Sequence, residues 1–98
     1  MSGSGNYPTV LNKTMTVANT EYSQALPTGT RKFTVSCVDG TAMRIAFVTG
    51  KVATPTAPYY AILANQSYES PDLDGNAALT VYGGGGGTGK IMQIIAWQ

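Results

Sequence analysis

The chain of 98 residues has no histidine and a single cysteine, Cys37. Without histidine, Ser-His and Cys-His catalysis and the commonest general base are excluded. One cysteine allows neither a disulfide within the chain nor a cysteine-based metal site. Cys37 alternates with Phe33 and Val35, which is typical of a small buried thiol on a strand. We therefore expect a protein that is not an enzyme and that has no catalytic residues, cofactor or metal.

Charged side chains are scarce as well. They make up 11% of the chain, against about 25% in an average soluble domain. Six basic and five acidic residues give a net charge of +1, which offers no electrostatic footprint to nucleic acid or to an anionic membrane. Because a small and nearly neutral surface is poorly protected against association, the composition favours a component of an assembly over a freely diffusing enzyme.

The chain also lacks a long hydrophobic run, since no apolar segment approaches the ~20 residues that cross a bilayer as a helix. The opening MSGSGNYP has neither a basic region nor an apolar run, so we expect no signal peptide, no membrane partner and synthesis in a cytosol. Residues 1–12 are predicted to form a flexible arm ahead of a domain at 13–98. Tyr7, Val10 and Leu11 would let this arm dock on a partner.

What the chain does contain is a series of short alternating runs separated by turn residues, with thirteen threonines and six tyrosines. These features are typical of an all-β sandwich or barrel. The predicted strands cover residues 13–18, 21–26, 31–38, 42–48, 58–64, 67–70, 77–83 and 90–97. We predict a single-domain, antiparallel, jelly-roll-like β-sandwich of about eight short strands. The best helix candidate is a single turn near residues 72–76.

Turn residues predict how some of these strands connect. Asp39-Gly40 matches a type I′ turn, in which both central residues need a positive φ, and it predicts a hairpin between 31–38 and 42–48. The inner face of the second strand is predicted to hold Met43, Ile45 and Phe47. The connection at 49–58 is long and contains Gly and Pro, so we expect it to cross from one sheet to the other.

The last predicted strand is apolar on both faces. Its inner face is predicted to hold Ile91, Ile95 and Trp97. Its outer face is predicted to hold Met92, Ile94 and Ala96. A strand of this kind is central in a sandwich or has its outer face covered by another subunit. Met92 and Ile94 are therefore predicted to bind a partner, as are the arm residues Tyr7, Val10 and Leu11.

Before that strand, Gly84–Lys90 almost spells the phosphate-binding sequence G-x-x-x-x-G-K. Ile91 stands where a Ser or Thr would hold Mg²⁺, and the following residues predict a strand instead of the helix whose N-terminus binds phosphate. A nucleotide site is therefore not expected. We predict that Gly83–Gly89 is a mobile hairpin loop that tolerates shortening.

Two further groups of residues have the chemistry to bind a ligand. Residues 72–76 resemble part of a calcium-binding loop, but they lack its alternating ligands and its closing Glu, so a polar turn is favoured. Aromatic side chains could stack on sugar rings if several shared one exposed face, and the candidates are Tyr59, Tyr60, Tyr68, Tyr82 and Trp97. The alternative is that these rings close the ends of the core.

The order of these segments resembles small virion proteins of tailed bacteriophages, over about residues 18–97. The most specific parts are EYSQALP, the RIAFVTGKV run that leads to PY, and the IIAW ending. None of them is a catalytic signature. The glycine run at 83–89 looks like a local expansion of a turn.

This resemblance implies a structural component of a virion, made in the host bacterial cytoplasm. Within that class it favours a capsid decoration (cement) protein. The expected partners are the major capsid protein or other virion subunits, and we expect a homo-oligomer. A neck or tail protein, and a carbohydrate-binding module used in host attachment, are the alternatives.

Overall fold

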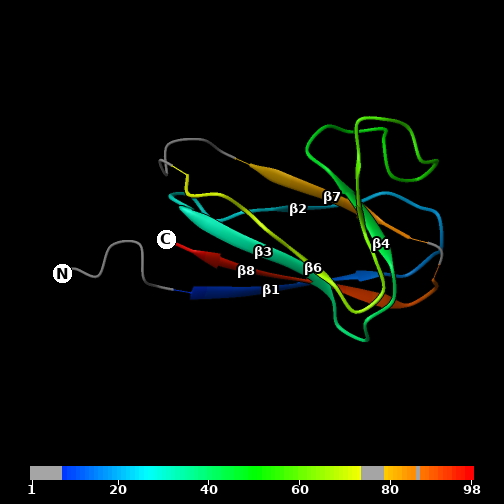
Figure 1. Cartoon of the computed structure of the whole chain (residues 1–98), viewed down its shortest axis with the longest axis horizontal. Helices are drawn as coiled ribbons and strands as arrows, with labels where there is room; N and C mark the ends of the chain where they lie inside the picture. The colour runs from blue at the N-terminus through cyan, green and yellow to red at the C-terminus, as the bar shows by residue number, and fades with distance from the viewer. Residues whose placement is uncertain (1–7, 74–78, 86) are drawn as a thin grey trace.

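The structure is a computed structural model that describes residues 8–73, 79–85 and 87–98. Within these residues, eight strands form two antiparallel sheets, which confirms the predicted all-β sandwich (Figure 1). The strands are β1 (Pro8–Met15), β2 (Tyr22–Ala25), β3 (Lys32–Cys37), β4 (Met43–Ala46), β5 (Tyr60–Ile62), β6 (Ser67–Glu69), β7 (Thr80–Gly84) and β8 (Lys90–Trp97).

The strand order is that of a jelly roll. One sheet has the order β1-β8-β3-β6 and the other has the order β2-β7-β4-β5. The pairs β1–β8, β2–β7, β3–β6 and β4–β5 nest about the middle of the chain, as in one long folded hairpin. Two further pairs, β3–β8 and β4–β7, roll this hairpin into two sheets. This arrangement is the double-sheet jelly roll.

Alternation along each strand directs one set of side chains between the sheets. In β3, Phe33, Val35 and Cys37 are buried and the residues between them are half-buried, as predicted. The core draws on both sheets and contains Met15, Leu26, Phe33, Val35, Cys37, Met43, Ile45, Ile62, Val81, Met92, Ile94 and Ala96. Cys37 is the buried thiol that its position predicted.

The predicted hairpin at Asp39-Gly40 is wrong, because β3 and β4 belong to different sheets. Gly40 has a φ of 81°, whereas Asp39 does not have a positive φ, so no type I′ turn forms. A hydrogen bond from the Gly40 N–H to the Cys37 carbonyl, at 3.0 Å, closes a turn one residue earlier. Each strand has one apolar face, and crossing between the sheets brings both faces into the same core.

The connection at residues 49–58 does not cross between the sheets, so this prediction is also wrong. β4 and β5 are antiparallel neighbours in one sheet, with Ile45 opposite Tyr60. The connection folds back over that sheet, because Val52 is fully buried and lies 3.5 Å from where a Cβ on Gly84 would be. The chain crosses instead between β5 and β6.

The first strand begins earlier than predicted. β1 pairs with β8 over its whole length, from Pro8 opposite Trp97 to Met15 opposite Lys90. Residues 8–12 therefore belong to the sheet, although the sequence assigned them to an arm. Residues 1–7, which include Tyr7, lie outside the described residues.

The two faces of β8 are the reverse of those predicted. The core contains the fully buried Met92, Ile94 and Ala96. The outer face carries the half-buried Ile91, Ile95 and Trp97. β8 lies between β1 and β3 (Figure 1), and a central strand that is apolar on both faces gives no signal in the sequence to tell the inner face from the outer.

The glycine run does not form the predicted hairpin loop. β7 and β8 lie in different sheets, and Gly83 and Gly84 are the last two residues of β7. A Cβ on Gly84 would lie 2.7 Å from the carbonyl oxygen of Thr20, whereas a Cβ on Gly87 would meet only the Lys90 side chain. Backbone packing therefore requires a glycine at position 84. The strand predicted after Lys90 is confirmed as β8.

Gly84→Ala is expected to lower the free energy of unfolding by about 1–3 kcal/mol, because the added methyl group meets rigid backbone. Gly87→Ala is the comparison variant, because the atoms nearest its added methyl group belong to the Lys90 side chain, which can shift more easily than backbone, so this variant should lose less stability. Urea denaturation of both variants and the parent chain measures the difference. Equal midpoints for the two variants would contradict the close packing at Gly84.

Candidate binding surface

Exposed apolar side chains are concentrated at the end of β4 and along β5. Eight large hydrophobic side chains among the described residues are 42–58% exposed, and five of them lie in this region. We call these five the β4–β5 patch, and its members are Phe47, Val48, Tyr59, Tyr60 and Leu63. Surface hydrophobic residues that are scattered singly are ordinary, whereas a contiguous set marks a binding surface.

Two open grooves run across the β4–β5 patch. One has a volume of about 270 Å³, with Ile45 and Ala46 among its lining residues and Val48 and Tyr60 on its sides. The other has a volume of about 520 Å³ and includes Leu63. Tyr59 lines both grooves, so its ring is the side chain that a ligand in either groove would touch.

Aromatic contacts join the β4–β5 patch to the core. The ring of Phe47 lies edge-on to that of the buried Phe33, with centroids 6.0 Å apart. Tyr68, from β6, lies 6.2 Å from Phe47 and 5.2 Å from Tyr60, again between centroids. These separations are those of favourable aromatic pairs. Two rings of the patch, Phe47 and Tyr60, are therefore held against rings of the other sheet.

Polar contacts fix the connection between β4 and β5. The Glu21 carboxylate accepts hydrogen bonds from Thr49 Oγ1 at 2.7 Å, from Gly50 N at 2.8 Å and from Lys51 N at 3.3 Å. The Arg44 guanidinium donates two hydrogen bonds to one carbonyl oxygen of this connection, that of Val52, at 2.8 and 3.0 Å. The patch is thus preorganised by side chains that do not belong to it.

The charge on Glu21 is stabilised by the groups it holds. Partial desolvation raises the pKa of Glu21, but the hydrogen bonds from Thr49, Gly50 and Lys51 outweigh it and hold the pKa below its ordinary value. The carboxylate therefore stays ionised at neutral pH and keeps its three donors in place.

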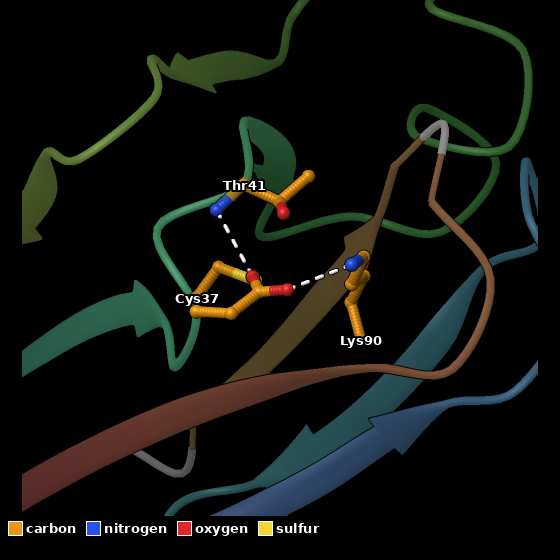
Figure 2. A network of polar contacts seen from close by, with 4 residues as sticks. Cys37, Thr41 and Lys90 are labelled. Carbon is orange, nitrogen blue, oxygen red and sulfur yellow. Dashed lines mark hydrogen bonds and ion pairs between the residues drawn. The ribbon is translucent and has the colours of Figure 1, made fainter.

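A second polar network joins the turn after β3 to the start of β8. Figure 2 shows Lys90 approaching the turn that carries Cys37 and Thr41. The Asp39 carboxylate accepts hydrogen bonds from Lys90 Nζ at 2.7 Å, from Thr41 N at 3.1 Å and from Cys37 Sγ at 3.2 Å. These three donors hold the pKa of Asp39 well below its ordinary value, and Lys90 has the largest effect.

This network stabilises the turn and gives no reactive thiol. Burial, and then the neighbouring Asp39, raise the pKa of Cys37, so the thiolate is disfavoured at neutral pH. Lys90 is an ion-pair partner of Asp39, and no helix follows it to hold a phosphate. The network therefore has a structural role.

The residues predicted to bind a partner do not form one surface. Val10 is 56% exposed on the outer side of β1, opposite Ile95 of β8. Leu11 is partly buried and packs against the core. Met92 and Ile94 are fully buried, so their assignment as surface anchors is corrected. For Tyr7, Val10 and Leu11, partner binding stays a prediction.

Sequence reasoning missed most of the β4–β5 patch. Phe47 was placed on the inner face of its strand, but β4 ends at Ala46 and the ring of Phe47 is 44% exposed. Alternation along the strand could not have found it, because Ile45 and Ala46 are both buried whereas Phe47 and Val48 are both exposed. The tyrosines are divided: Tyr59, Tyr60 and Tyr68 gather at the patch, while Tyr82 lies on another strand, β7.

The described residues contain neither a metal site nor a membrane-spanning helix. Across 8–73, 79–85 and 87–98, no group of three His, Cys, Asp or Glu side chains is close enough to hold a metal ion. In that part of the chain no helix has the length and apolarity needed to cross a bilayer. Residues 74–76 of the predicted polar turn lie outside the described residues.

No protein-family model, curated protein or solved structure matches the chain.

Asp39→Asn tests the turn network through its pH dependence. Because the folded state lowers the pKa of Asp39 from 3.8, the carboxylate stabilises the fold above that pH and loses this effect as the pH falls through the lower, folded pKa. The variant should be less stable than the parent near about pH 7, and the difference should shrink below about pH 4. Urea midpoints across this range measure it. A difference that stays constant down to about pH 2 would contradict the ionic role of Asp39.

Proposed function

We propose that the protein is a structural component of a tailed-phage virion, a decoration protein that binds and stabilises the capsid shell through the β4–β5 patch. The observation that carries this proposal is the gathering of five of the eight exposed large hydrophobic side chains on one preorganised region. The resemblance of the sequence to small virion proteins supplies the biological setting. The jelly roll agrees with it but also serves unrelated functions.

The chemistry of the β4–β5 patch suits a protein partner. Aromatic side chains are enriched where protein interfaces are fully buried, and charged ones are depleted there. The patch offers Phe47, Tyr59 and Tyr60 as anchors, and Arg44, which lines the larger groove, already donates to the Val52 carbonyl. Because Glu21 and the ring contacts fix the patch before binding, little conformational entropy is lost on association.

Stabilisation of a shell follows from binding alone. A protein that binds the assembled shell more tightly than its free subunits shifts the equilibrium toward the assembled form. Many copies on one particle add their effects, so that weak individual contacts give a firm attachment. The partner is the major capsid protein in this proposal. A neck or tail position would use the same patch against a different virion subunit.

A carbohydrate-binding function is the second candidate. The observation in its favour is that Tyr59 and Tyr60 are 42% and 50% exposed beside a groove. Sugars also need hydrogen-bonding groups next to the rings. The side chains around that groove, Ile45, Ala46, Val48 and Pro58, are apolar. Protein binding is therefore favoured.

Tyr59→Ser should weaken attachment to particles by about 30-fold or more, because an interface anchor contributes about 2 kcal/mol. Val38→Ser is the matched control, since Val38 is 55% exposed at the turn after β3 and should have little effect. Binding of each labelled variant to particles that lack the protein measures the affinity. Tyr59 is 42% exposed and does not belong to the core cluster, so the variant should fold.

Three outcomes would count against the proposal. The chain could be absent from purified particles of a phage that encodes it. The Tyr59→Ser and Val38→Ser variants could also bind to particles equally well. A glycan array could also give specific binding that Tyr59→Ser abolishes while particle attachment persists, and this result would favour the carbohydrate module.

A further inference from the structure

β1 is the longest of the four edge strands in the described part of the chain. It has eight residues, whereas the other three edge strands, β2, β5 and β6, have four, three and three. Proteins protect exposed sheet edges by keeping them short, by placing charges on them or by covering them. β1 carries one charged residue, Lys13. Among the described residues it pairs with β8 alone.

The hydrogen-bond pattern shows which backbone groups of β1 face the open edge. The Val38 N–H donates to the Ile91 carbonyl at 3.0 Å, so Ile91 directs its backbone polar groups toward β3. In an antiparallel ladder this direction alternates along the strand. Met92 and Ile94 therefore direct theirs toward β1.

The register then places the free groups on β1. Met92 lies opposite Lys13, and Ile94 lies opposite Leu11, so the odd-numbered residues of β1 use their N–H and C=O groups on β8. Val10, Asn12 and Thr14 direct theirs away from the sheet. The side chains of these three residues are exposed on the outer face, and no second strand among the described residues pairs with this edge.

We propose that β1 pairs with β1 of a second copy of this chain, antiparallel and about a two-fold axis at Asn12. Asn12 then lies opposite Asn12 of the second copy, and Val10 lies opposite Thr14. By symmetry, Thr14 also lies opposite Val10 of the second copy. Each of the three residue pairs exchanges two backbone hydrogen bonds. The two β1-β8-β3-β6 sheets become one continuous sheet across the dimer.

The side chains favour this occupant and this register. Lys13 lies opposite Leu11 of the second copy, so the two like charges do not face each other. The Asn12 amides can hydrogen-bond across the axis. A two-fold pairing is closed, because each edge is used once and no fibre can grow from it.

The pairing leaves the β4–β5 patch free. β1 contacts β2, and β5 is at the far edge of the sheet that β2 begins. The dimer therefore carries its two patches away from the shared edge. The pairing does not depend on the proposed function, and it holds whether the patch binds a capsid or a sugar.

The mass of the protein in solution, measured by sedimentation, tests the pairing when the N–H group of Asn12 is removed. The parent chain is expected to sediment at twice its monomer mass. Asn12→Pro removes an N–H that faces the open edge and not β8, a position where a strand tolerates proline, so this variant should be monomeric. Asn12→Ser keeps the N–H and should remain dimeric. A monomeric parent, or a dimeric Asn12→Pro variant, would overturn the proposal.

Cysteine substitution tests the register even if the proline variant does not fold. Residues of a hydrogen-bonded antiparallel pair have Cα atoms about 5.5 Å apart, within disulfide range. Asn12→Cys should therefore give a covalent dimer under mild oxidation. Thr14→Cys is the matched control, because the axis at Asn12 separates the two copies of position 14 by several residues. Crosslinking of both variants, of neither, or of Thr14→Cys alone would overturn the register.

Discussion

The pairing of the last strand, β8, with β1 on one side and β3 on the other holds this jelly roll closed. β8 pairs with β1 over eight residues and with β3 over six, and its inner side chains Met92, Ile94 and Ala96 are fully buried. This central position follows from the nesting of four antiparallel strand pairs about the middle of the chain. Because β8 is covered on both edges, the exposed backbone of its sheet is left on β1 and β6.

Contacts with neighbouring loops and with the first sheet fix the exposed edge of the second sheet. β7 approaches Thr20 closely at Gly84, and Val52 of the following connection is buried over the same strand. Glu21 and Arg44 then fix the connection, and the ring of Phe47 rests on Phe33 of the first sheet. The β4–β5 patch is thus a preorganised apolar surface, and preorganisation lowers the entropy cost of binding a partner.

Alternating polarity was enough to predict eight strands and the inner face of β3, because Phe33, Val35 and Cys37 alternate with polar residues. It could not orient β8, where both faces are apolar. Turn residues such as Asp39-Gly40 restrict local backbone angles, but they do not say which sheet the next strand joins. The glycines of β7 read as a loop, since the contact between Gly84 and Thr20 exists only in the folded chain. The patch was missed for a related reason, because its side chains meet only when β5 pairs with β4.

In our proposal, this protein works by burying the β4–β5 patch against a neighbouring virion subunit. A cryo-EM map of the intact particle tests this claim most directly. We expect density of another subunit against Phe47, Tyr59 and Tyr60. A map that resolves the chain on the particle with these three side chains facing solvent would contradict it.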